Sequence, residues 1–165
     1  SVAFAQRQDL DGRFLDTSRD GFRAALDVSA FSLVALAKAC ENALKPGGSI
    51  LALTYYGSQK VVRNYNVMGV AKAALEASVR YLAADLGEKQ VRVNAISAGP
   101  IKTLSAKGIR DFNDMFRHAA EKAPLQRNVE AAEVGKSAVY LVSDLSSGVT
   151  GEIHYVDCGY NLMGM

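Results

Sequence analysis

Cysteine, histidine and net charge are all scarce in this sequence of 165 residues, and each scarcity removes a class of function. Cys40 and Cys158 stand far apart with no CxxC pair, and His118 and His154 are the histidines that could join them. The pattern therefore predicts neither a zinc site nor a disulfide framework, and we expect no metal at the functional site. It is typical of a reducing compartment, and we expect a cytoplasmic protein.

Charge and hydropathy argue against two further classes of function. The 19 Lys and Arg residues against 17 Asp and Glu residues leave a formal net charge of +2, spread along the chain. That balance does not support binding to nucleic acid or to a membrane surface. No run of about 18 apolar residues occurs, so no transmembrane helix is predicted. With 49% hydrophobic residues, the chain is long enough to bury a real core.

The two ends of the sequence differ in character. Ser1 to Ala5 include no initiating Met, no basic segment and no apolar stretch of signal-peptide length. Residues 153–159, in contrast, have the pattern of a buried strand that runs into a glycine turn. We therefore expect the carboxyl-terminal part of a larger protein.

Two kinds of segment alternate along the chain. Apolar residues at helical spacing predict helices over 21–44, 65–86 and about 131–142, and a polar, weakly amphipathic segment covers 103–122. Short continuous apolar runs predict buried strands over 49–54, 91–96 and about 152–156, with residues 97–100 as a loop. This alternation predicts an α/β fold: a Rossmann-like, doubly wound parallel sheet within a three-layer αβα domain.

The carboxyl edge of such a sheet is where ligands bind, which places Tyr55, Tyr56, Ser97 and residues 98–105 at the working edge. Tyr65 and Lys72 are seven residues apart, nearly two helical turns, so both side chains lie on one face. A cation near a phenol strengthens its hydrogen bond to a developing oxyanion, and Lys72 could also bridge two sugar hydroxyls of a nucleotide. Taken alone, this spacing is weak evidence for a shared site, because such a pair on an amphipathic helix is usually an aromatic residue at the core edge and a solvated charge.

Three segments carry a resemblance to a known family: Leu53–Gly57, Asn64–Glu76 and Val91–Leu104. They resemble the NADH-dependent enoyl-acyl-carrier-protein reductases of bacterial type II fatty-acid synthesis, and the resemblance runs over essentially the whole chain. This family is a branch of the short-chain dehydrogenase/reductase superfamily, whose commoner members place the tyrosine four residues before the lysine. That position here is Met68, which has no hydroxyl, so the Tyr65-x6-Lys72 spacing distinguishes enoyl reductases from ketone or alcohol dehydrogenases.

The resemblance implies an activity and a set of site residues. A hydride from NADH would reduce the β-carbon of a trans-2-enoyl thioester carried by acyl carrier protein, leaving an enolate. Tyr65 would donate a hydrogen bond to the enolate oxygen, Lys72 would hold the nicotinamide ribose, and Tyr55 would be the second active-site tyrosine. The implied cofactor contacts are Val2, Lys72, Ile101, Lys102, Thr103, Leu104 and Ser105, and the implied substrate contacts are Ala5, Tyr55 and Tyr65. The segment after Thr103 would correspond to a mobile substrate-binding loop and helix.

The resemblance also implies a homotetramer, and it exposes a gap. The family's glycine-rich pyrophosphate turn has no counterpart here, because Gly47-Gly48 precedes a strand instead of following one. We therefore expect residues 1–165 to be one partial domain that lacks the amino-terminal pyrophosphate-binding half. This 165-residue piece by itself should bind NADH poorly and be inactive.

Two alternatives stay open on the sequence. The protein could be another short-chain reductase, acting on a ketone or on a different conjugated enoyl substrate, although Met68 argues against the ketone. It could instead be a non-catalytic, nucleotide-binding relative, because one fold hosts many functions. The presence of both Tyr65 and Lys72 argues against that second alternative.

Overall fold

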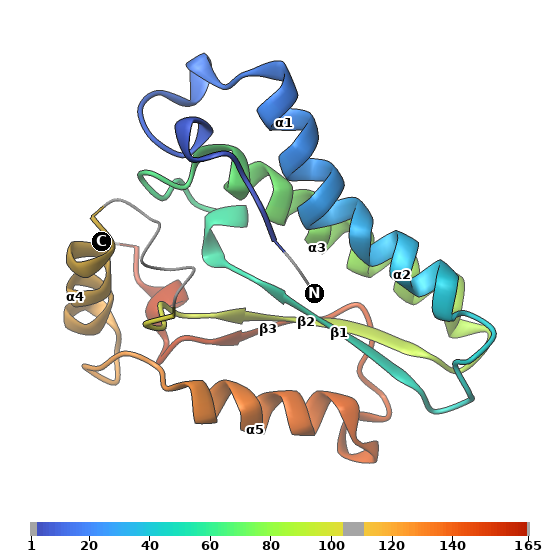
Figure 1. Ribbon diagram of the computed structural model, residues 1–165. Coiled ribbons are helices and arrows are strands. Elements are labelled where there is room, and N and C mark those ends of the chain that lie inside the picture. The colour runs from blue at the N-terminus through green and yellow to red at the C-terminus, as the bar shows by residue number, and fades with distance from the viewer. Residues whose placement is uncertain (1–2, 104–110, 165) are drawn as a thin grey trace.

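A parallel sheet forms the centre of the molecule. The computed structural model describes residues 3–103 and 111–164. Within these residues, three strands pair in parallel in their order along the chain: β1 (Ser49–Thr54), β2 (Arg92–Ala98) and β3 (Ile153–Val156). Figure 1 shows the sheet between helices. The predicted α/β fold with a parallel sheet is confirmed.

The helices cover both faces of this sheet, as predicted (Figure 1). One layer contains α1 (Arg19–Leu26), α2 (Ser32–Cys40) and α3 (Asn66–Gly87), and the other contains α5 (Ala131–Val142). The remaining helix, α4 (Phe112–Lys122), lies beyond the carboxyl ends of the strands. Within the described ranges, no helix has both the length and the apolar character needed to cross a membrane.

The core forms where α3 lies on the sheet. Leu75 and Val79 of α3 belong to one apolar cluster with Val93 and Ala95 of β2, and all four side chains are buried. These α3 residues recur at helical spacing, so one face of the helix is apolar. Burying each large aliphatic side chain contributes about 1.5–3 kcal/mol, which fixes α3 firmly against the strands.

The helix predicted over 21–44 is interrupted. Residues Asp27–Phe31 form a π-helical turn between α1 and α2, and α2 ends at Cys40. Within this turn the buried Ser29 hydroxyl is hydrogen-bonded to both the amide nitrogen and the carbonyl oxygen of Phe4. A wide turn changes the helical phase, which lets Ser29 face the amino-terminal segment while the flanking helices keep their apolar sides inward.

Two strand predictions need correction. Ser97 and Ala98, expected in a loop, continue β2 because they pair with Tyr155 and Val156 of β3. The prediction that β1 is buried on both faces is wrong at Leu53, which is 51% exposed. Its side chain contributes to the wall of a cavity at the carboxyl edge of the sheet.

Candidate active site

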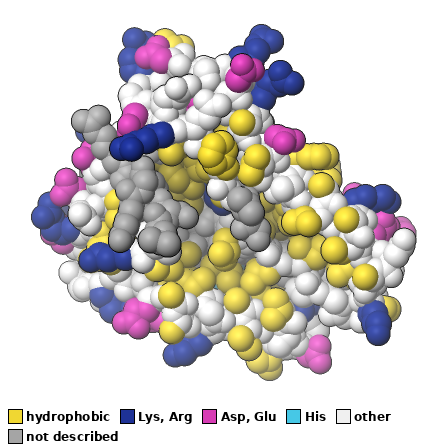
Figure 2. All heavy atoms as spheres, in the orientation of Figure 1, with side chains coloured by type: hydrophobic (Ala, Val, Ile, Leu, Met, Phe, Trp, Pro, Cys, Tyr) yellow, Lys and Arg dark blue, Asp and Glu magenta, His cyan; other side chains and the backbone are white. Residues whose placement is uncertain are grey.

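The cavity at the carboxyl edge of the sheet has a volume of about 590 Å³ and collects residues from five parts of the chain. Its lining comes from the amino-terminal segment, the end of β1, the start of α3, the loop after β2, and α4. Figure 2 shows hydrophobic side chains gathered across the middle of this side of the molecule, with charged groups around the rim. Such a cavity suits a ligand that is largely apolar.

Tyr65 stands immediately before α3, between two asparagines with left-handed backbone angles. The φ angles are 60° at Asn64 and 34° at Asn66, a region that asparagine enters more readily than most residues. The Asn66 side-chain amide donates to the carbonyl oxygens of Leu10 (2.9 Å) and Gly12 (3.2 Å). These bonds fix the backbone on which the Tyr65 side chain is mounted.

The Tyr65 ring is packed closely against the turn that follows β1. It meets the Tyr55 ring edge to face, with centroids 5.0 Å apart. A Cβ atom on Gly57 would lie 2.6 Å from the Tyr65 ring, and one on Gly69 would lie 2.7 Å from the Gly57 carbonyl oxygen. The two glycines therefore allow the turn, α3 and the ring to approach each other. Burial raises the pKa of both tyrosine hydroxyls, so both phenols stay protonated at neutral pH.

Lys72 lies further along α3 with its side chain only 9% exposed. Its Nζ donates to the Leu53 carbonyl oxygen at 2.9 Å, which uses one of the three ammonium donors. Burial lowers the pKa of Lys72, and the negative charge of Glu76 partly opposes that shift. The lysine therefore presents a cation to the cavity from a fixed position.

The structure gathers most of the predicted site residues around this cavity. Its lining includes Ala5, Tyr55, Tyr65, Lys72, Ile101 and Thr103. Lys102 is placed differently, because its Nζ lies over the Phe116 ring of α4, 4.7 Å from the centroid. Val2, Leu104 and Ser105 lie outside the described residues.

Sequence reasoning missed two residues that contact the predicted site. The Sδ atom of Met115 on α4 accepts a hydrogen bond from the Tyr55 hydroxyl at 3.2 Å. Glu76 is 4% exposed and accepts hydrogen bonds from the hydroxyls of Thr54 and Ser58. A glutamate one turn after Lys72, on the buried face of a helix, is the sequence signal that could have identified Glu76. No local pattern indicates the contact with Met115.

The lining fits the nicotinamide half of a dinucleotide better than a metal ion. The Lys72 ammonium offers donors to sugar hydroxyls, and the backbone from Gly99 to Thr103 follows β2 at the edge where such sheets bind nucleotides. In the described part of the chain, no group of three or more His, Cys, Asp and Glu side chains could hold a metal ion.

Comparison with known proteins identifies related sequences over almost the whole chain. A family model described as enoyl-(acyl carrier protein) reductase matches residues 1–161. The enoyl-[acyl-carrier-protein] reductase [NADH] of Rickettsia bellii is 62% identical over 163 residues, which cover 99% of this chain and 62% of that protein. The corresponding protein of Staphylococcus aureus, named for NADPH, is 58% identical over 98% of this chain and 63% of its own length.

Solved structures of enoyl-acyl carrier protein reductases are also similar to this chain. The Bacillus cereus enoyl-acyl carrier protein reductase, crystallised with NADP+ and an indole naphthyridinone, is 60% identical and superposes with a TM-score of 0.96. The Anaplasma phagocytophilum enzyme in complex with NAD is 52% identical, with a TM-score of 0.95. Each comparison covers 99% of this chain and 63% of the solved one.

These matches define first a class, proteins with a parallel α/β sheet whose solved members include complexes with NADP+ and with NAD. Within that class, the chain belongs to the enoyl-(acyl carrier protein) reductase family. It spans about 62% of the length of the curated relatives that it matches.

Proposed function

We propose that the protein is an NADH-dependent enoyl-acyl-carrier-protein reductase, which converts trans-2-enoyl thioesters on acyl carrier protein into saturated acyl thioesters during fatty-acid elongation. The observation that carries the proposal is the convergence of Tyr55, Tyr65 and Lys72 on one largely apolar cavity. The names of the relatives support the same substrate class and cofactor.

In this proposal Tyr65 is the hydrogen-bond donor that stabilises the enolate. When bound, NADH would supply the hydride for the β-carbon, and the electrons of the carbon–carbon double bond would move toward the thioester oxygen. Tyr65, protonated because it is buried, donates a hydrogen bond to that oxygen as negative charge develops on it. The enolate then takes a proton from solvent at its α-carbon, which completes the two-electron reduction. Only interactions that strengthen toward the transition state accelerate the reaction, and this hydrogen bond is one of them.

Lys72 has two roles in the proposal. Its ammonium binds the nicotinamide ribose and its positive charge favours hydrogen-bond donation by Tyr65. Val2, Ile101, Lys102, Thr103, Leu104 and Ser105 are proposed to line the cofactor, and Ala5 and Tyr55 the acyl substrate. We propose that residues 1–165 are one partial domain, and that the pyrophosphate is bound by the part of the relatives' length that this chain does not match.

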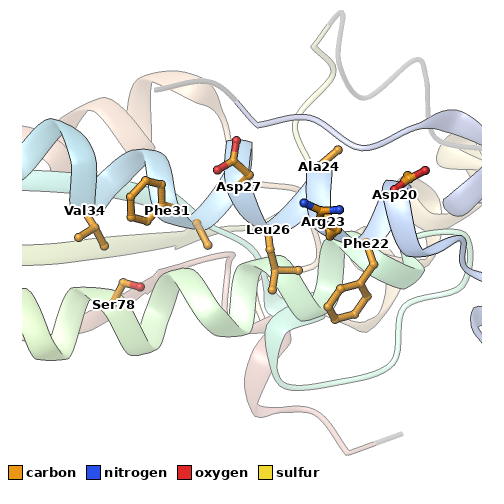
Figure 3. Close-up of a pocket in the computed structure, with 10 residues that line it drawn as sticks. Asp20, Phe22, Arg23, Ala24, Leu26, Asp27, Phe31, Val34 and Ser78 are labelled. Carbon is orange, nitrogen blue, oxygen red and sulfur yellow. The ribbon is translucent and has the colours of Figure 1, made fainter.

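Acyl carrier protein is the proposed partner, and a homotetramer is the proposed assembly. A hollow of about 880 Å³ supports self-association, and it is lined by α1, the π-helical turn, α2 and Ser78 of α3 (Figure 3). Phe31, which lines the hollow, is 58% exposed, and Tyr81 elsewhere on α3 is 77% exposed. Large apolar surfaces of this kind mark interaction sites. Cys40 and Cys158 are unpaired, which supports a reducing compartment, and we propose the cytoplasm.

The proposal is tested by cofactor oxidation in the complete protein that contains this chain. Crotonyl thioester and acetoacetyl thioester are compared, each with NADH and with NADPH. Oxidation with the crotonyl compound alone supports the enoyl reductase, whereas activity with acetoacetyl thioester alone would identify a ketone reductase. Inactivity with both substrates, together with cofactor binding in calorimetry, would indicate a non-catalytic relative.

A calorimetric comparison tests the expected division of the cofactor site. The complete protein should bind NADH, and the 165-residue chain should bind it poorly and show no turnover. Matching affinities would contradict the assignment of the pyrophosphate site to the remaining length.

A further inference from the structure

Glu76 is a buried carboxylate that the proposed mechanism does not use. It lies on the face of α3 that packs against the sheet, and its side chain is 4% exposed. An ionised carboxylate is unfavourable in such a place unless hydrogen bonds or an opposite charge compensate for lost water. Its surroundings provide both.

The hydrogen bonds come from the two sides of the turn that carries Tyr55. The Glu76 Oε1 atom accepts from the Thr54 Oγ1 at 2.7 Å and from the Ser58 Oγ at 2.5 Å. Thr54 is the last residue of β1, and Ser58 closes the short helix Tyr56–Ser58. A single carboxylate oxygen therefore ties both ends of this turn to α3.

The opposite charge comes from Lys72, one helical turn earlier on the same face. Lys72 and Glu76 both hold the end of β1, the first through the Leu53 carbonyl oxygen and the second through Thr54. The titratable groups around this pair include the phenols of Tyr65, Tyr55 and Tyr155, each with its pKa raised mainly by burial. Arg7 is a further charged residue, which lines the same cavity as Lys72. Because these phenols are neutral, Glu76 supplies the negative charge that favours the protonated form of Lys72.

We propose that Glu76 is a positioning residue of the active site, whose carboxylate fixes the turn that carries Tyr55 and lies one helical turn from Lys72, against the same end of β1. This inference rests on the proposed function, because it assigns a role within the same site. It predicts two separable effects: the loss of the charge acts through Lys72, and the loss of the hydrogen bonds acts through Tyr55.

The first test is Glu76→Gln in the complete protein, with crotonyl thioester and NADH. The amide oxygen of Gln can still accept from Thr54 and Ser58, but the negative charge is gone. Lys72 should then lose its proton at lower pH, so the alkaline fall in kcat should begin earlier. We expect the kcat of Glu76→Gln, relative to that of the wild type, to fall progressively as the pH rises from 7 to 9.

The matched variant is Ser58→Ala, which keeps the carboxylate and removes one of its two donors. We expect kcat to fall by about threefold to tenfold at every pH because Tyr55 is less well placed, with the alkaline limb unmoved and the KM for NADH unchanged. A residue with a purely structural role would lower the melting temperature without separating the pH profile of Glu76→Gln from that of Ser58→Ala.

The outcomes distinguish this inference from the proposed function. An inactive wild-type protein would overturn the proposed function itself. An active wild type together with a Glu76→Gln profile that superimposes on it would overturn the role of the charge. If Ser58→Ala kept the wild-type kcat, the role of Glu76 in positioning Tyr55 would be overturned. If Glu76→Gln shows no cooperative thermal unfolding, and is therefore not properly folded, the Ser58→Ala result alone tests the proposal.

Discussion

The two walls of the cavity are held in place very differently. On the α3 wall, Tyr65 and Lys72 are both 9% exposed, and hydrogen bonds tie this helix to the end of β1. On the α4 wall, Ala119 is the buried residue of the helix, and Met115 and Phe116 are only partly covered. The groups assigned to the chemistry thus belong to the part of the site that folding itself fixes, as electrostatic preorganisation requires.

Among the described residues, side-chain contacts join the α4 wall to the rest of the site. Met115 accepts from the Tyr55 hydroxyl, and the Lys102 ammonium lies over the Phe116 ring. The helix begins after Asp111, which has a left-handed backbone and accepts from the side chain of Asn64 at 3.2 Å. Under the proposed function, we expect this wall to adjust to different acyl chains without disturbing the tyrosines and the lysine opposite.

The largest expected effect is on the α3 wall, from Tyr65→Phe. Removing the hydroxyl takes away the donor to the enolate oxygen, and we expect kcat to fall by about 10²–10³-fold. NADH affinity should change little, whereas Lys72→Ala should weaken both turnover and NADH affinity. Steady-state kinetics and calorimetric titration of the complete protein measure the two effects separately. Unchanged turnover in Tyr65→Phe would remove the assigned role.

The α3 wall was also the part of the site that the sequence predicted best. The spacing indicated one side of the helix for Tyr65 and Lys72, and both line the cavity, although Tyr65 lies just before α3 instead of within it. The resemblance, and not the spacing alone, assigned the two residues to one site. The π-helical turn at Asp27–Phe31 was not predictable, because it depends on a contact between Ser29 and a residue 25 positions earlier. For the same reason, the contact of Tyr55 with Met115 could not be read from a local pattern, since 60 residues separate them.

Gly57→Ala tests whether close packing of the α3 wall controls the chemistry. The new methyl group would approach the Tyr65 ring to 2.6 Å, so the ring or the turn must move. Misplacement of a reacting group lowers rates steeply, and we expect kcat to fall by about tenfold to a hundredfold in assays of the complete protein.

Gly135→Ala in α5 is the matched control for that variant. A Cβ atom at Gly135 would meet nothing within 4 Å, and the residue lies in the interior of a helix. The substitution should leave kcat unchanged and raise the free energy of unfolding by about 0.5–1 kcal/mol, measured by denaturant titration. Equal activity losses in the two variants would show that the Gly57 effect is not local to Tyr65.

The smallest effect should come from the α4 wall, in Met115→Leu. Leucine has nearly the same volume as methionine, so the wall keeps its shape, but the sulfur that accepts from the Tyr55 hydroxyl is lost. We expect the KM for the enoyl thioester to change by about twofold to threefold, with kcat nearly constant, because this contact does not strengthen as charge develops. The measurement is a substrate titration at saturating NADH, beside Tyr65→Phe. If Met115→Leu lowered kcat as far as Tyr65→Phe does, α4 would have to take part in the chemical step, and the distinction between a fixed wall and an adjustable one would fail.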